Sequence, residues 1–119
     1  MSFSDPPGPP GSPTVSDIKK RSCVLSWTPP RSDGGTPVTG YTVDCKMDDG
    51  FKWNNVSEGE KVTDTRYTIT GLQEGYRYDF RVAAINRAGT GDYSKTREPV
   101  TLQEPIGEQN LSFPSFSKE

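Results

Sequence analysis

Few residues of this sequence have side chains suited to chemistry, and histidine is absent altogether. Without histidine the chain has no Ser-His or Cys-His nucleophile pair, no imidazole general base and no imidazole metal ligand. Cys23 and Cys45 supply the only thiols, and two buried free thiols or one disulfide would fit them. The lack of the commonest catalytic groups predicts that the protein is not an enzyme.

Three short motifs suggest ligand sites but lack what such sites need. Gly89-Thr90-Gly91 is followed neither by the lysine of a phosphate loop nor by a helix, so we expect a turn. Asp48-Asp49 lacks the alternating oxygen ligands and terminal Glu of a calcium loop. Lys19-Lys20-Arg21 is typical of a solvated loop, since a pI near 5.2 with interspersed signs provides no broad basic face. We therefore expect no cofactor, no metal and no nucleic-acid partner.

The sequence also bears on membranes and secretion. No apolar run approaches the ~20 residues that span a bilayer, and the N-terminus lacks the apolar region of a signal peptide, so no membrane partner is expected. Two glycosylation sequons, Asn55-Val56-Ser57 and Asn110-Leu111-Ser112, would matter only in a secreted protein.

A chain of 119 residues allows one domain with flanking segments. Leu, Ile, Val and Phe together make up less than the roughly one fifth that is usual for folded chains. A net charge of only −2, with all five Tyr and both Trp lying between Trp27 and Tyr93, nevertheless favours a small aromatic core.

The two ends differ in character from the middle. Residues 1–13 contain five prolines and two glycines and resemble a stiff polyproline-type linker. Residues 102–119 show no period of 2 or 3.6, which favours a tail or linker. Leu111, Phe113 and Phe116 in this tail would alternatively suit an apolar peptide that docks on another module.

Between these ends, short alternating runs are broken by turn residues every eight to twelve positions, which indicates an all-β sandwich or barrel. About seven strands result, including a weak first one at Val15–Ile18. Leu72 precedes Tyr78 by six residues, a spacing that lets the tyrosine hydroxyl reach back to the connecting loop. The predicted structural core comprises Leu25, Trp27, Tyr41, Val43, Tyr67, Ile69, Leu72, Tyr78, Phe80 and Val82.

Several motifs together carry a resemblance to a known family. Ser26-Trp27-Thr28-Pro29-Pro30, Gly40-Tyr41-Thr42-Val43, the run from Tyr78 to Gly89 and the Leu72–Tyr78 spacing occur in the order and at the separations found in fibronectin type III domains. The segment closely resembles that family. The resemblance implies a seven-stranded, immunoglobulin-like β-sandwich at residues 8–101, with a proline-rich leader or linker at 1–7 and a flexible tail or linker at 102–119.

Asp5–Pro10 followed by Ser32-Asp33-Gly34-Gly35 looks like the modules of giant muscle proteins of the titin and twitchin type. That resemblance implies a non-catalytic structural and interaction module of an intracellular, sarcomeric scaffold. Its partners would be neighbouring immunoglobulin and fibronectin type III domains and thick-filament proteins such as myosin, and the isolated domain would be monomeric. The alternative is an extracellular adhesion or receptor module that binds a protein ligand.

Three residues are candidates for a partner surface: Trp53, Arg77 and Arg81. Trp53 either covers a sheet edge or serves as an exposed binding anchor. Arg77 and Arg81 project opposite Phe80, near Asp44 and Lys46 if the strands pair as the family implies, so either cross-strand charge pairs or a charged docking face would explain them. The family also implies that Cys23 and Cys45 lie on opposite sheets about 10 Å apart, which favours free thiols.

Overall fold

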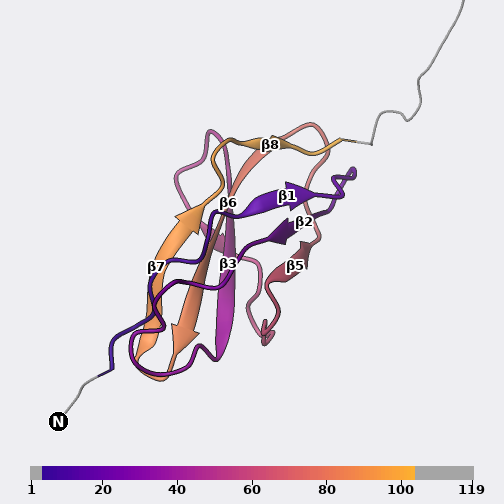
Figure 1. The fold of residues 1–119 in the computed structure, drawn as a ribbon. Helices are drawn as coiled ribbons and strands as arrows, with labels where there is room; N and C mark the ends of the chain where they lie inside the picture. Colours follow the sequence, from indigo (N-terminus) through magenta and orange to yellow (C-terminus); the bar gives the residue numbers. More distant parts are fainter. Residues whose placement is uncertain (1–3, 104–119) are drawn as a thin grey trace, which may run out of the picture.

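The computed structural model describes residues 4–103, which form two antiparallel sheets packed as a sandwich with no helix among them (Figure 1). The smaller sheet has the order β1-β2-β5, and the larger has the order β4-β3-β6-β7 with β8 also paired to β6. The strands are β1 (Thr14–Ser16), β2 (Cys23–Ser26), β3 (Gly40–Met47), β4 (Asn54–Asn55), β5 (Arg66–Ile69), β6 (Arg77–Asn86), β7 (Gly89–Lys95) and β8 (Val100–Thr101).

The last two strands form one interrupted edge of the larger sheet, because both pair with β6. Between them Thr96 continues the pairing, since its backbone N–H donates to Phe80 O over 2.9 Å and its hydroxyl accepts from Phe80 N over 3.3 Å. Pro99, which has no N–H, then precedes β8. Counting β7 and β8 as one edge gives seven strands, which confirms the predicted seven-stranded sandwich.

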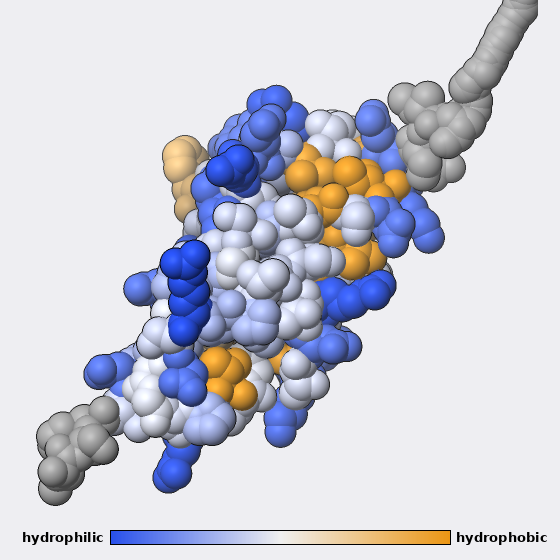
Figure 2. Space-filling view, viewed as in Figure 1, coloured by the Kyte–Doolittle hydropathy of each residue, from blue (hydrophilic) through white to orange (hydrophobic). Residues whose placement is uncertain are grey.

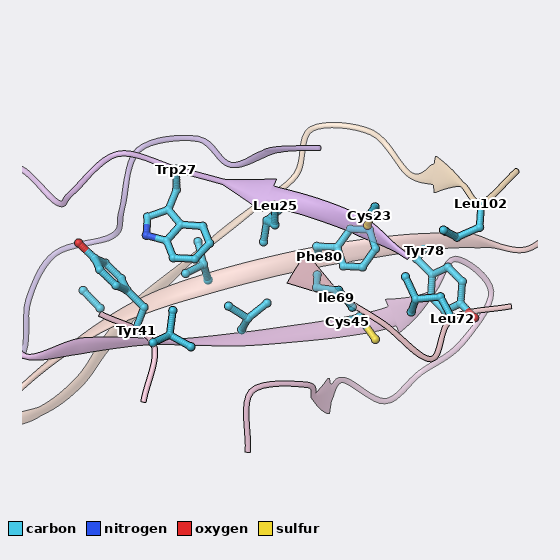
Figure 3. Close-up of a cluster of buried hydrophobic side chains, with 14 residues drawn as sticks. Cys23, Leu25, Trp27, Tyr41, Cys45, Ile69, Leu72, Tyr78, Phe80 and Leu102 are labelled. Atoms are coloured by element: carbon cyan, nitrogen blue, oxygen red, sulfur yellow. The ribbon is translucent and has the colours of Figure 1, made fainter. Parts of the chain in front are cut away.

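The core lies between the two sheets and extends along the molecule (Figure 3). Trp27 and Tyr41 meet edge to face at one end, with ring centroids 5.3 Å apart, and Leu72, Tyr78 and Leu102 lie at the other end. The structure buries nine of the ten predicted core residues, namely Leu25, Trp27, Tyr41, Val43, Ile69, Leu72, Tyr78, Phe80 and Val82. The tenth, Tyr67, is half-buried and donates its hydroxyl to Val56 O.

The first strand is shorter and begins earlier than the predicted Val15–Ile18. It ends at Ser16 because Asp17 has a φ of +48°, a left-handed conformation that breaks the extended backbone. A turn closed by Lys19 N–H donating to Ser22 O then leads into β2.

The crossover from β5 to β6 is fixed by a tyrosine. Gly71, with a φ of +76°, turns the chain just after β5, which ends at Ile69. The hydroxyl of Tyr78 then accepts a hydrogen bond from the backbone N–H of Gln73 over 3.1 Å, which satisfies a donor that the crossover leaves without a strand partner. This contact confirms the expected reach of Tyr78 back to the loop.

The proline-rich segment lies along the fold instead of standing free of it. The backbone N–H groups of Asp5, Gly8 and Gly11 donate to Gly34 O, Ser32 O and Thr28 O over 2.8–2.9 Å. Pro7, Pro10 and Pro13 are buried at the same spacing of three. This spacing matches the three residues per turn of a polyproline helix, so one side of it donates hydrogen bonds while another packs on the domain.

Two glycines and an asparagine hold the start of this segment. A Cβ atom on Gly34 would overlap Asp5 O, and one on Gly91 would overlap Pro7 O, so only glycine permits the close approach. The side-chain amide of Asn86 donates to both Asp5 O and Asp33 O. Residues 5–7, assigned above to a leader before the domain, are therefore bound to it.

Candidate functional site

The outer face of the larger sheet brings together most of the charged residues that the sequence singled out. Pairing of β3 with β6 places Asp44 opposite Arg81 and Lys46 opposite Asp79, as the resemblance implied. β4 adds Asn55 beside Asp44. Because alternate residues of a strand share a face, these side chains form cross-strand rows on the side of β6 opposite Phe80.

Arg81 is the centre of this face. Its Nε donates to Asp44 Oδ2 over 2.9 Å, and its guanidinium carbon lies 4.4 Å from the ring centroid of Trp53 and 3.9 Å from that of Tyr93. Lys46 Nζ lies 5.4 Å from the same Trp53 ring. We call Lys46, Trp53, Arg81 and Tyr93 the cation–aromatic cluster, in which each ring meets a cation.

Two buried carboxylates neutralise most of the positive charge beneath the cluster. Asp44 accepts hydrogen bonds from Arg81 and from Asn55 Nδ2, and Asp79 lies 3.7 Å from Lys46 Nζ and 3.6 Å from Lys95 Nζ. Burial and the neighbouring Asp44 raise the pKa of Tyr93, although Arg81 opposes them. The outer face is thus an internally paired network with little unsatisfied charge to offer a partner.

Of the three predicted surface residues, the structure leaves only Arg77 well exposed. Its side chain is 59% exposed and forms an ion pair with Asp48, whereas that of Arg81 is 27% exposed and occupied by its aromatic neighbours. Trp53 is half-buried and covers the two cations of the cluster. The sequence left open whether these arginines form cross-strand charge pairs or a charged docking face. Arg81 forms such a pair with Asp44, and Arg77 is exposed enough to contact a partner.

Two exposed aromatic residues, in segments at the same end of the larger sheet as Arg77, were not predicted from the sequence. Phe51, in the β3–β4 turn, is fully exposed, and Tyr76, immediately before β6, is 49% exposed. Between these segments lies a hollow of about 230 Å³ lined by residues 47–49 and 75–77. We call Phe51, Tyr76 and Arg77 the aromatic end patch. The sequence contains one indication that Phe51 is exposed. It directly follows the turn residues Asp48-Asp49-Gly50, and a residue at a turn tip is not buried by a strand.

The remaining chemical candidates have structural roles. Cys23 and Cys45 are free and buried on facing sheets, and burial is the largest cause of the raised pKa of each thiol, which reaches about 12 for Cys23. Gly89-Thr90-Gly91, for which a turn was expected, is instead the start of β7. Arg87 and Ala88 form the turn before it, because Asn86 at the end of β6 pairs with Gly89. Within residues 4–103, no three possible ligands gather into a metal site and no helix is long and apolar enough to cross a membrane.

Comparison with known proteins extends these observations. The family model for the fibronectin type III domain matches residues 8–100. The chain is 39% identical to striated-muscle M-protein of Gallus gallus over 88% of its own length and 7% of that protein, and 37% identical to fast-type myosin-binding protein C of Mus musculus over 80% and 8%. It thus spans less than a tenth of these curated relatives. Among solved structures, titin domains A168–A170 share 36% identity with a TM-score of 0.79, over 85% of this chain and 34% of that one.

Proposed function

Because this chain belongs to the fibronectin type III family, we propose that it is a non-catalytic structural and protein-interaction module of a multidomain, intracellular scaffold protein of muscle. The observation that carries the proposal is the likeness of nearly the whole domain to M-protein and myosin-binding protein C. The internally paired outer face fits this role, because its charged groups stabilise the sheet instead of forming a catalytic cleft.

The structural part of this function rests on how tension crosses the fold. The described residues start at one end of the sandwich and finish near the other (Figure 1). Force applied through them loads the hydrogen bonds of the proline segment and of β8 against a single core, so we expect several bonds to fail together. Constant-velocity pulling of the chain between flanking marker domains will show one discrete unfolding event, and gradual extension would contradict the mechanical role.

The interaction part of this function is supported by the aromatic end patch. Aromatic residues and arginine are enriched in protein interfaces, and a fully exposed Phe51 gains nothing from the core. The partners that fit are a neighbouring domain of an array and a thick-filament protein such as myosin. One relative, myosin-binding protein C, is named for binding myosin.

Co-sedimentation of the full chain with myosin filaments tests the interaction. We expect saturable binding that Phe51→Ser and Arg77→Ala weaken by about tenfold or more, as hot-spot residues do. Arg66→Ala is the matched control, because Arg66 is an exposed arginine on β5 in the other sheet. No binding, or equal binding by all variants, would contradict a myosin-binding role for the patch.

The intracellular location is supported by the two cysteines and by the first sequon. Both thiols are free, whereas cysteines of secreted domains are commonly paired. Asn55 Nδ2 already donates to Thr42 Oγ1 over 2.6 Å and to Asp44 Oδ1 over 2.9 Å, so a glycan, which replaces one of its two hydrogens, would remove a contact of the outer face. Mass analysis of the protein, unfolded in denaturant and alkylated before reduction, will show two free thiols and an unmodified Asn55, because unfolding exposes the buried cysteines to the reagent. A disulfide or a glycan would instead indicate the extracellular module.

A further inference from the structure

An apolar groove opens along the seam where the two sheets meet at β1 and β8. It measures about 260 Å³, and its apolar lining comes from Pro13, Val15, Ile18 and Val100. Val15, Ile18 and Val100 are packed against the core yet remain partly exposed. Figure 2 shows an apolar patch over the region in which Figure 1 places β1 and β8.

The seam stays open because the strands on both sides are short. β1 has only three residues before Asp17 breaks it, and among residues 4–103 it pairs with β2 alone, so no described strand occupies its other edge. On the opposite side, β7 ends at Lys95 and β8 begins only at Val100. A free strand edge beside an apolar groove can accept an extended peptide.

The size of the groove indicates what it can hold. Pockets for whole small molecules measure roughly 300–1,000 Å³, so this groove suits one or two apolar side chains of a peptide instead. The rim, which includes Arg97 and Glu98, is polar and exposed.

We propose that the segment Leu111–Phe116 of this same chain docks in the groove between β1 and β8. Residues 104–119 lie outside the described part of the structure, but the exit point is fixed, because Leu102 is fully buried and hydrogen-bonded to Gly75 and Tyr76. The groove residue Val100 is three positions before Gln103. The seven residues 104–110 can extend about 23 Å, which lets the segment return to the groove.

The composition of the segment matches the groove. Leu111 and Phe113 are two positions apart, so both point to the same side of an extended peptide, as two side chains entering one groove must. Pro114 limits strand pairing beyond that point, because it cannot donate to a neighbouring strand.

Charge also favours a return of the segment Leu111–Phe116 toward the groove. Lys19, Lys20 and Arg21 form the turn that directly follows Ile18, and all three are exposed. Leu72 N–H donates to Arg21 O, which holds this turn at the end of the sandwich where Gly75 binds Leu102. Glu104 and Glu108, which precede Leu111 in the sequence, carry the charge opposite to that of this basic turn, so attraction between them favours a return of the segment toward Ile18.

A spin label placed in the segment of the full chain tests the proposal. Ser112→Cys provides one accessible thiol, because Cys23 and Cys45 are buried and resist alkylation. We expect a nitroxide at this position to reduce the amide NMR signals of Val15, Ile18 and Val100 by more than half, while that of Gly34, which binds Asp5 at the opposite end of the sandwich, stays unchanged. Adding Leu111→Ser and Phe113→Ser to the labelled chain should restore the signals, and Lys19→Glu with Lys20→Glu should restore them in part.

Two outcomes would overturn the proposal. Equal signals with and without Leu111 and Phe113 would show that the apolar side chains do not hold the segment in the groove. The second outcome is docking of the segment on another copy of the chain. A mixed sample tests it, in which the isotope-labelled chain has no nitroxide and the nitroxide is on an unlabelled chain. Signal loss in that mixture would assign the groove to a second copy of the chain, whereas full signals there support docking within one chain.

Discussion

Replacing Arg81 by methionine measures how much the cation–aromatic cluster contributes to folding. Methionine keeps an unbranched stem between the rings of Trp53 and Tyr93 but removes the guanidinium. A hydrogen bond to a charged group contributes ~1.5–3 kcal/mol, and each cation–π contact ~0.5–1 kcal/mol at a partly exposed site. We therefore expect Arg81→Met to lower the free energy of unfolding by about 3 kcal/mol, because buried Asp44 also loses its counter-ion.

Urea denaturation of the full chain, followed by circular dichroism, provides the assay. Arg77→Met is the matched control, since it breaks an exposed arginine–aspartate pair on the same strand and should cost less than about 1 kcal/mol. Adding Asp44→Asn to Arg81→Met should recover part of the loss, because the uncompensated carboxylate is then gone. Equal costs for the two arginine variants would refute the reasoning and show that Arg81 behaves as a solvated surface residue.

Three further predictions concern the crossover, the proline segment and a buried thiol. Tyr78→Phe should lower the free energy of unfolding in urea by ~1–2 kcal/mol, because Gln73 N–H loses its acceptor; an unchanged value would contradict the role of the hydroxyl. Gly91→Ala should displace Pro7 and speed hydrogen exchange of the proline segment while β6 stays protected, whereas unchanged exchange would show that the segment tolerates a side chain there. The pKa of Cys23 is raised from 9.0 to about 12, so below pH 9 the thiol is neutral in both the folded and the unfolded chain and stability is at its full value. That stability should fall by up to ~1.4 kcal/mol per pH unit between pH 9 and 12, and Cys23→Ala should flatten the slope; equal slopes would contradict it.

Much of the sheet could be predicted because strands repeat every two residues. Alternation alone placed Phe80 inward and Arg81 outward, and antiparallel pairing then brought Arg81 to Asp44. Alternation did not predict that Asp79 and Ala83, on the outward side of β6, would be buried. Asp79 is covered by the long side chains of Lys46 and Lys95 from the neighbouring strands, and Ala83 lies between its strand partners Thr42 and Tyr93.

The contacts of the proline segment and the exposure of Phe51 could not be predicted in the same way. Binding of Asp5 and Gly8 requires that the carbonyls of Gly34 and Ser32 point toward them, and the conformation of that loop follows no repeating pattern. The turn residues before Phe51 indicate that it lies at a turn tip, but its exposure also depends on whether another segment reaches that turn, which is decided by the tertiary fold.

The docking of the proline segment also constrains how this chain can change over evolutionary time. Gly91 and Pro7 are far apart in the sequence, yet a side chain at position 91 would occupy the place of the Pro7 carbonyl. A mutation at either position therefore alters which residues are tolerated at the other. Among descendants of this domain, those that lose the proline segment become free to replace Gly91, so positions 7 and 91 should vary together, whereas Gly34 remains restricted by its φ of +80°.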